Sequence, residues 1–132
     1  GCGKGTIGKS FREAGLNIVT DYDPAIKGKD APAKPADLTV CVDVMEHIEP
    51  DCLDAVIADL ARVTKKILFV AISTIPSKRT MSDGRNTHLL VQNDVWWRGQ
   101  FERAGFNVRR VWKTGLPEWV CMMNAPGHMR RV

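Results

Sequence analysis

Long apolar runs, closely paired cysteines and extended basic tracts are all absent from this sequence. No apolar run approaches the ~20 residues that cross a bilayer, so we expect no membrane span. The four cysteines show no C-x-x-C spacing, which favours buried free thiols over a zinc site or disulfides. No signal-peptide pattern opens the chain, so a cytoplasmic location is the expectation.

The chain also has no large excess of charge of one sign. It has 19 basic and 15 acidic residues, and its net charge is +4. The basic residues include scattered doublets such as Lys65–Lys66 and Arg109–Arg110, without interleaved aromatics. This pattern indicates a solvated surface and disfavours a nucleic-acid groove. We expect a small-molecule substrate as the partner, and the sequence gives no signal for an oligomeric state.

An initiator methionine is missing too, and the chain opens directly on the glycine-rich stretch GCGKGTIGKS. Loops of this kind follow a β-strand that aims them at their ligand. We therefore expect a single domain over residues 1–132, truncated at its N-terminus and lacking its first strand. The length suits one domain with one core.

The glycine-rich stretch matches three cofactor motifs at once. Residues 3–10 fit the nucleotide P-loop, G-x-x-x-x-G-K-[ST], and residues 3–8 fit the dinucleotide fingerprint, G-x-G-x-x-G. Residues 1–5 resemble the G-x-G-x-G turn of Rossmann-like methyltransferases. Asp23 follows Gly3 by about 20 residues, where an acid accepts the ribose hydroxyls in both dinucleotide and methyltransferase sites.

Hydrophobic periodicity and breakers predict alternating strands and helices, and hence a mostly parallel α/β sheet. The Leu38–Val42 run is continuous enough to predict a strand buried on both faces. The expected elements are a helix over 8–14, strands over 16–22, 38–42 and 67–72, a helix over 50–64, a long polar loop over 73–92, a helix over 93–104, and a strand pair over 106–112 and 118–123.

The stretch ADLTVCVDVMEHIEP, residues 36–50, discriminates between the three loop interpretations. It closely resembles the fourth strand and following turn of class I S-adenosylmethionine-dependent methyltransferases. Residues 19–24 resemble that family's ribose-binding strand, and residues 104–123 resemble its last helix-to-strand junction and terminal hairpin. The resemblance implies a shortened Rossmann-like methyltransferase sheet, mostly parallel with a C-terminal antiparallel hairpin.

The same resemblance implies S-adenosyl-L-methionine as the cofactor and a methyltransferase activity that needs no metal. Residues 24–36 are too few for the helix and third strand of the family, so the part of the cofactor site that contacts the adenine is shortened. Asp30 either replaces the family's usual polar contact to the adenine or is a loop residue. The cofactor-binding residues that the resemblance implies are Gly1, Cys2, Gly3, Gly5, Tyr22, Asp23, Asp43 and Val44.

His88 and Asp43 are the candidate catalytic residues. His88 lies in the 73–92 loop, where it either takes a proton from the acceptor or pins the loop with a hydrogen bond. If His88 is a loop residue, the role passes to Asp43 or to proximity alone. Arg85 is a candidate for holding an anionic substrate. We expect a structural role for His47, because the Glu-His pair recurs on this turn in the family.

The sequence thus favours transfer of a methyl group to an unidentified small polar acceptor. Two alternatives stay open at this point. One is a P-loop kinase or nucleotide hydrolase that uses residues 3–10. The other is a non-catalytic fragment of a Rossmann-like domain.

Overall fold

A computed structural model describes residues 1–128 of the chain. It contains two compact units, Gly1–Lys34 and the part from Pro35 onward. The expectation of a single domain stays a prediction. Within residues 1–128, no helix is long and apolar enough to cross a membrane.

One helix, α1 (Thr6–Glu13), dominates the first unit and corresponds to the helix predicted over 8–14. It begins after Gly5, whose φ of 82° is left-handed, and Gly15 follows its end with a φ of 92°. These are conformations that glycine adopts without strain. Arg12 then ties the helix to the returning chain, because it donates to the Asp21 carboxylate at 2.8 Å.

The strand predicted over residues 16–22 does not form, so this prediction is wrong. This segment belongs to no strand ladder of the described structure. A strand gains its stability from pairing and from burying one face. Here Leu16 is 50% exposed and Ile18 is 96% exposed, so the apolar residues that suggested a strand bury little surface.

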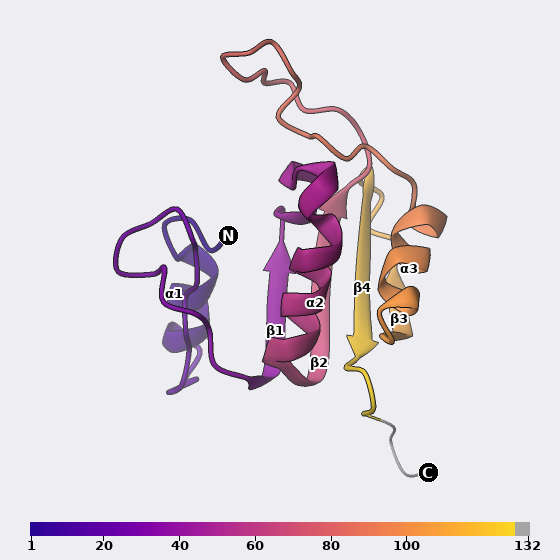
Figure 1. The fold of residues 1–132 in the computed structure, drawn as a ribbon. Helices are drawn as coiled ribbons and strands as arrows, with labels where there is room; N and C mark the ends of the chain where they lie inside the picture. Colours follow the sequence, from indigo (N-terminus) through magenta and orange to yellow (C-terminus); the bar gives the residue numbers. More distant parts are fainter. Residues whose placement is uncertain (129–132) are drawn as a thin grey trace. The chain divides into compact units, whose positions relative to one another are not determined.

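The second unit holds a four-stranded sheet in the order β1-β2-β4-β3 (Figure 1). β1 pairs parallel with β2, and β4 pairs antiparallel with both β2 and β3. Three strands therefore point one way and β4 runs against them, which confirms the predicted sheet with its C-terminal hairpin. The strands are β1 (Ala36–Val42), β2 (Thr64–Ser73), β3 (Asn107–Trp112) and β4 (Glu118–Asn124).

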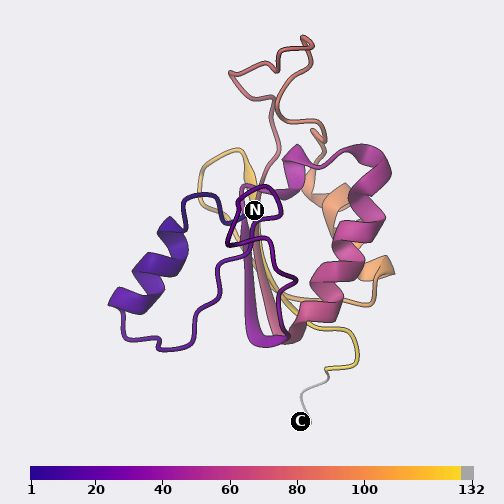
Figure 2. The same cartoon turned by 60° about the vertical axis from the view of Figure 1, so that its left-hand side comes forward.

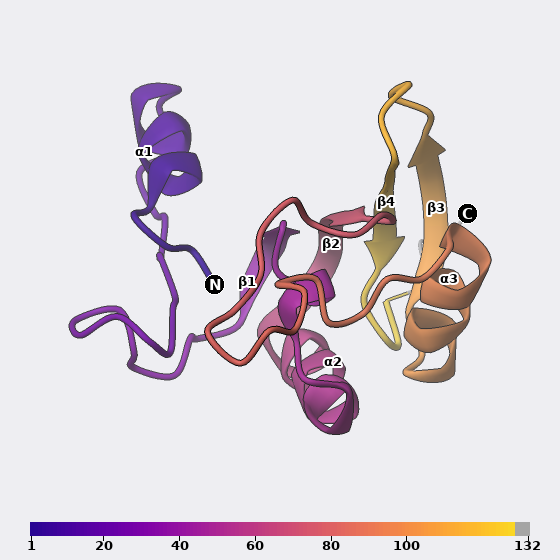
Figure 3. The same cartoon turned by 90° about the horizontal axis from the view of Figure 1, so that it is seen from above.

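Two helices, α2 (Leu53–Val63) and α3 (Asp94–Arg103), cover one face of this sheet (Figures 1 and 3). The Asn93 side chain caps α3 by accepting the Trp96 N–H at 2.8 Å. Alternate residues of β2 point under the helices and are fully buried. The core residues include Ile57, Leu68, Val70, Ile72, Trp97, Phe101, Trp119, Cys121 and Met123.

β1 is less buried than its sequence predicted. Only Cys41 of this strand is buried, and Leu38 is 47% exposed. The reason is position, because β1 ends the strand order and pairs with β2 alone among the described strands. Its apolar run therefore forms an edge strand in this unit. Burial raises the pKa of the Cys41 thiol to about 12.

All four cysteines are free thiols, as predicted. Burial was predicted as well; it holds for Cys41 and Cys121, whereas Cys2 is only half-buried. Cys52 is exposed, since it lies in the short 3₁₀ turn η2 (Pro50–Cys52) that leads into α2.

The loop between β2 and α3 extends beyond the carboxyl ends of β1 and β2 (Figures 1 and 2). Its two limbs meet through the Asn86 side chain, which accepts the Ser77 and His88 N–H groups and donates to the Ser77 carbonyl. A bridge between Thr80 and Asn86 adds to this network. The long loop predicted from its polar composition is thus an internally hydrogen-bonded lobe.

Candidate functional site

The glycine loop of the first unit closes onto the acidic turn that follows it. The Gly3 N–H donates to Asp23 Oδ2 at 2.8 Å, and the Ala25 N–H donates to Asp23 Oδ1 at 3.0 Å. The two backbone donors, that of Ala25 first, lower the pKa of Asp23, so its carboxylate is ionised at neutral pH. Cys2 donates its N–H to the Tyr22 carbonyl at 2.8 Å. The structure therefore brings these four predicted cofactor residues together.

A second carboxylate, that of Asp21, packs against the first turn of α1. A Cβ added at Gly8 would collide with it, and one added at Gly5 would lie 3.1 Å from its Oδ2 atom. Packing of Asp21 therefore explains why residue 8 is glycine, whereas Gly5 is required by its left-handed backbone. The position favours a negative charge, because the helix N-terminus is the positive end of its dipole.

These contacts remove support for a P-loop. Lys9 lies along the exposed helix and pairs with Glu13 at 3.7 Å, and the Ser10 hydroxyl donates to the Thr6 carbonyl at 3.2 Å. In a P-loop, the lysine would reach terminal phosphates and the serine would bind magnesium. Since the Asp21 carboxylate lies at this helix end, a triphosphate would also meet a like charge.

Asp43 follows β1 with a left-handed backbone, at a φ of 53°. It is the only non-glycine residue of the described chain with a positive φ. Its N–H donates to the Ala71 carbonyl at 2.9 Å, which fixes the turn to β2. Strained backbone of this kind persists at functional sites where the surroundings hold it. Asp43 itself is exposed and Val44 is half-buried.

Glu46 is the most buried acidic residue in this region, at 1% exposure. It lies in η1 (Met45–His47), directly after the turn at Asp43. Its Oε1 atom accepts the Ser73 N–H at 3.0 Å, which joins η1 to the end of β2. Its Oε2 atom is buried without a hydrogen-bond partner.

His47 of η1 and His88 of the loop meet beside this carboxylate. Their rings contact edge to face, with centroids 4.8 Å apart. His47 Nδ1 lies 2.7 Å from the Thr87 carbonyl oxygen, and His88 Nδ1 lies 2.7 Å from that of Ile75. His88 therefore pins the loop, and its ring lies at the carboxyl ends of the parallel strands β1 and β2, where ligands bind in open α/β sheets.

Arg85 already has two carboxylate partners. It donates to both oxygens of Glu49 at 3.0 Å and to Asp83 at 2.8 Å. The guanidinium lowers the pKa of Glu49 through its hydrogen bonds, and the pKa of Asp83 falls through the Arg85 backbone N–H and side chain. The expected role of Arg85 in holding an anionic substrate is therefore not supported. Instead, Arg85 ties the loop to the turn before α2.

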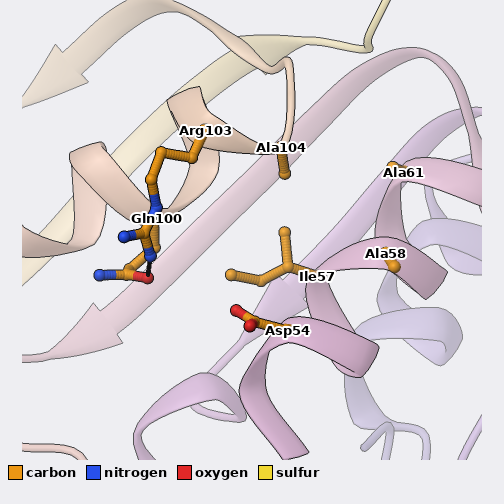
Figure 4. A pocket seen from close by; sticks show the side chains of 7 residues that line it. All are labelled: Asp54, Ile57, Ala58, Ala61, Gln100, Arg103 and Ala104. Atoms are coloured by element: carbon orange, nitrogen blue, oxygen red, sulfur yellow. Dashed lines mark hydrogen bonds between the residues drawn. The ribbon is translucent and has the colours of Figure 1, made fainter.

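A surface hollow of about 540 Å³ lies elsewhere, between α2 and α3 (Figure 4). It contains none of the residues predicted for the site. The Arg103 side chain donates to Gln100 across its α3 wall. The remaining wall is mostly alanine, so the hollow is a groove between two helices. Its lining residues are Asp54, Ile57, Ala58, Ala61, Gln100, Arg103 and Ala104.

No family model and no curated protein matches the chain, but solved structures do. The human N-acetylserotonin methyltransferase, in complex with S-adenosylmethionine, has a TM-score of 0.56 at 14% identity, over 72% of this chain and 31% of its own. The Synechocystis magnesium protoporphyrin IX methyltransferase, with bound S-adenosylhomocysteine, has 0.53 at 17% identity, over 70% and 45%. An O-methyltransferase from Planctomyces limnophilus, in complex with apigenin, has 0.52 at 12% identity, over 71% and 31%.

These similarities establish the fold. The chain has the Rossmann-like fold of class I S-adenosylmethionine-dependent methyltransferases, as the motifs predicted. It spans less than half of the length of these three solved structures.

Sequence reasoning missed the buried role of Glu46. The Glu-His pair was visible, and His88 was visible as a polar residue of a long loop. Their approach depends on how the loop folds back through Asn86, which no local pattern encodes.

Proposed function

We propose that the chain is part of an S-adenosylmethionine-dependent methyltransferase that acts on a small polar acceptor. The observation that carries this proposal is the hydrogen bond from the Gly3 N–H to Asp23. It joins a glycine loop to the acid about 20 residues later, the arrangement that binds the ribose of an adenosine cofactor. The fold of the second unit supports the same class.

The residues of the first unit fit this cofactor. Each Asp23 oxygen accepts one backbone N–H, and an ionised carboxylate offers about four lone-pair sites, so each oxygen can accept a ribose hydroxyl as well. A Cβ at Gly3 would meet no atom within 4 Å, so space for a ligand lies beside the loop backbone. The Asp21 carboxylate disfavours a triphosphate more than it disfavours the methionine part of the cofactor, because that part carries an ammonium group beside its carboxylate.

When bound, the cofactor supplies a methyl group that its sulfonium already activates. The chain must then orient the acceptor and accept a proton where the acceptor loses one. A carbonyl can only accept a hydrogen bond, so the Nδ1 atom of His88 carries the proton that it donates to Ile75. In the neutral ring its Nε2 atom has the lone pair, and we assign this atom to take the proton of the methyl acceptor.

Asp43 and Val44 are proposed to contact the cofactor from the end of β1. The support is the left-handed backbone of Asp43, which lies at the carboxyl ends of the parallel strands, where ligands bind. The small size of the acceptor is proposed by analogy with the apigenin bound to the Planctomyces limnophilus enzyme.

Thermal denaturation of the 132-residue chain with three ligands tests the proposal. S-adenosylhomocysteine at roughly 100 times its dissociation constant should add about 2.7 kcal/mol to the free energy of unfolding. ATP with magnesium and NAD should add nothing. Protection by ATP with magnesium alone would restore the nucleotide-binding alternative, and protection by none of the three would favour a non-catalytic fragment.

A further inference from the structure

Glu46, His47 and His88 form a cluster with the composition of a metal site. One potential ligand atom from each residue lies within 4.8 Å of the other two. The first two come from η1 and the third from the far limb of the loop. The cluster therefore joins segments that are distant in sequence at the carboxyl ends of β1 and β2.

The carboxylate of the cluster is incompletely satisfied. Glu46 is 1% exposed, and Oε1 is held by the Ser73 N–H at 3.0 Å. Its Oε2 atom is buried and has no hydrogen-bond partner among the described residues. Burying an unpaired carboxylate oxygen is costly unless a cation or donor compensates it. The fold therefore maintains a buried, unpartnered carboxyl oxygen next to two imidazoles.

Both imidazoles are oriented by backbone carbonyls. The Nδ1 atoms of His47 and His88 lie 2.7 Å from the carbonyl oxygens of Thr87 and Ile75. Each Nδ1 therefore carries a proton, and in the neutral ring each Nε2 has the lone pair. A carbonyl that fixes one ring nitrogen so that the other binds a metal is the usual second shell of metal-ligating histidines.

We propose that Glu46 Oε2 and the Nε2 atoms of His47 and His88 bind a divalent first-row transition-metal ion. Two imidazoles and one carboxylate suit Fe²⁺, Co²⁺, Mn²⁺ or Zn²⁺. Such ligands lie about 2.0–2.2 Å from their ion, so two of them are at most about 4.4 Å apart. One ligand atom of each residue already lies within 4.8 Å of one from the other two, so the three side chains can reach a shared ion after small side-chain movements. His47, expected to be structural, becomes a ligand.

Three protein ligands leave coordination positions open. His47 is exposed and His88 is half-buried, so an oxygen ligand can reach the ion from the loop side. This step rests on the proposed function: an acceptor hydroxyl bound to the ion loses its proton more readily, and that proton passes to solvent water. In the metal-bound chain the His88 lone pair binds the ion, so the ion activates the acceptor there; the role of His88 as a base, assigned above, applies to the metal-free chain.

Metal binding is tested first without cofactor, on the full chain freed of metal by chelation. Titration with Co²⁺, followed by visible absorption, should show one ion per chain. Glu46→Gln keeps an oxygen for the Ser73 N–H but removes the charge. We expect Glu46→Gln and His88→Ala each to weaken Co²⁺ binding by at least about 100-fold, since loss of second-shell partners alone costs about 10–100-fold.

The chain offers two matched controls. His128→Ala removes the remaining histidine, which lies outside the cluster, and should leave the affinity unchanged. Cys52→Ser removes an exposed thiol that could bind Co²⁺, and should also leave it unchanged. Circular dichroism checks that each variant is folded, and His47→Ala replaces Glu46→Gln if the latter unfolds.

Absence of Co²⁺ binding by the folded chain would overturn the proposal. Equal binding by the folded His88→Ala variant, or loss of binding in Cys52→Ser, would overturn it as well. The titration contains no S-adenosylhomocysteine, so its outcome is independent of whether the methyltransferase proposal holds.

Discussion

At the scale of single residues, Asp43 combines strain with a candidate function. A left-handed backbone costs an ordinary residue about 1–2 kcal/mol, and a β-branched residue tolerates it worst. We expect Asp43→Val to lose at least about 1 kcal/mol of stability, whereas Asp43→Gly should be close to neutral. Thermal denaturation measures both. Because the glycine variant keeps the turn, it isolates the side chain, and we expect its affinity for S-adenosylhomocysteine to fall. Wild-type affinity in this folded variant would remove the Asp43 side chain from the cofactor site.

Asp23 gives the sharpest test of the cofactor residues. Asp23→Ala should weaken binding of S-adenosylhomocysteine by roughly 1.5–3 kcal/mol, the range for hydrogen bonds to a charged group. Lys9→Ala is the control, since the Lys9 side chain pairs with Glu13 on the exposed face of α1, and it should bind as the wild type does. Calorimetric titration of both variants provides the measurement. A large loss at Lys9 with little at Asp23 would reverse the assignment.

At the scale of elements, β1 and β2 show what a sequence pattern predicts and what it leaves out. Both runs were predicted as strands, and both form, because continuous apolar runs bounded by polar residues favour strands. Their burial depends on neighbours: β2 pairs on both sides, and β1 pairs on one. The same dependence explains the failed strand over residues 16–22, whose residues have strand propensity but no ladder partner.

The candidate site also contains features that the local sequence predicts and features that depend on distant parts of the chain. The link between Gly3 and Asp23 was predictable, because a motif and its spacing encode it. The cluster of Glu46, His47 and His88 was not, because its approach depends on hydrogen bonds inside a loop of irregular structure. Local patterns carry no information on such a long-range approach.

Two leucines on adjacent strands should differ sharply in their contribution to stability. Leu68 of β2 is fully buried, and Leu38 of β1 is 47% exposed. We expect Leu68→Ala to cost about 2–5 kcal/mol through lost burial and a cavity. Leu38→Ala should cost well under half as much. Chemical denaturation of both variants gives the comparison, and equal losses would mean that the Leu38 face of the sheet is covered in solution.

The loop over residues 73–92 should depend on its ion pairs to Arg85. Glu49→Gln removes the carboxylate that accepts hydrogen bonds from both terminal nitrogens of Arg85. We expect trypsin to cleave the variant a few-fold faster at the exposed Lys78 and Arg79, because the lobe opens more often. Glu102→Gln, which removes an exposed ion pair with Arg98 in α3, is the matched control. Equal cleavage in the two variants would show that Asn86, rather than Arg85, holds the loop.

At the scale of the whole molecule, the two units differ in what stabilises them. Every residue of the hydrophobic core lies between Cys41 and Ala125, whereas Gly5 and Gly8 are the only buried residues among the first 34. A helix of eight residues is marginal by itself. We therefore expect the first unit to open at much lower free energy than the sheet of the second.

Hydrogen exchange on the intact chain measures this difference and tests the proposed cofactor site together with it. Amides of β2 and β4 should be strongly protected. Those of α1 and those near the hydrogen bond between Gly3 and Asp23 should exchange fast. S-adenosylhomocysteine at roughly 100 times its dissociation constant should slow exchange in the first unit by about 100-fold, since a ligand that binds the closed form opposes opening by mass action. Adenosine triphosphate with magnesium is the control and should protect nothing. Ligand protection confined to the second unit would mean that the glycine loop does not bind the cofactor, even if the chain as a whole does.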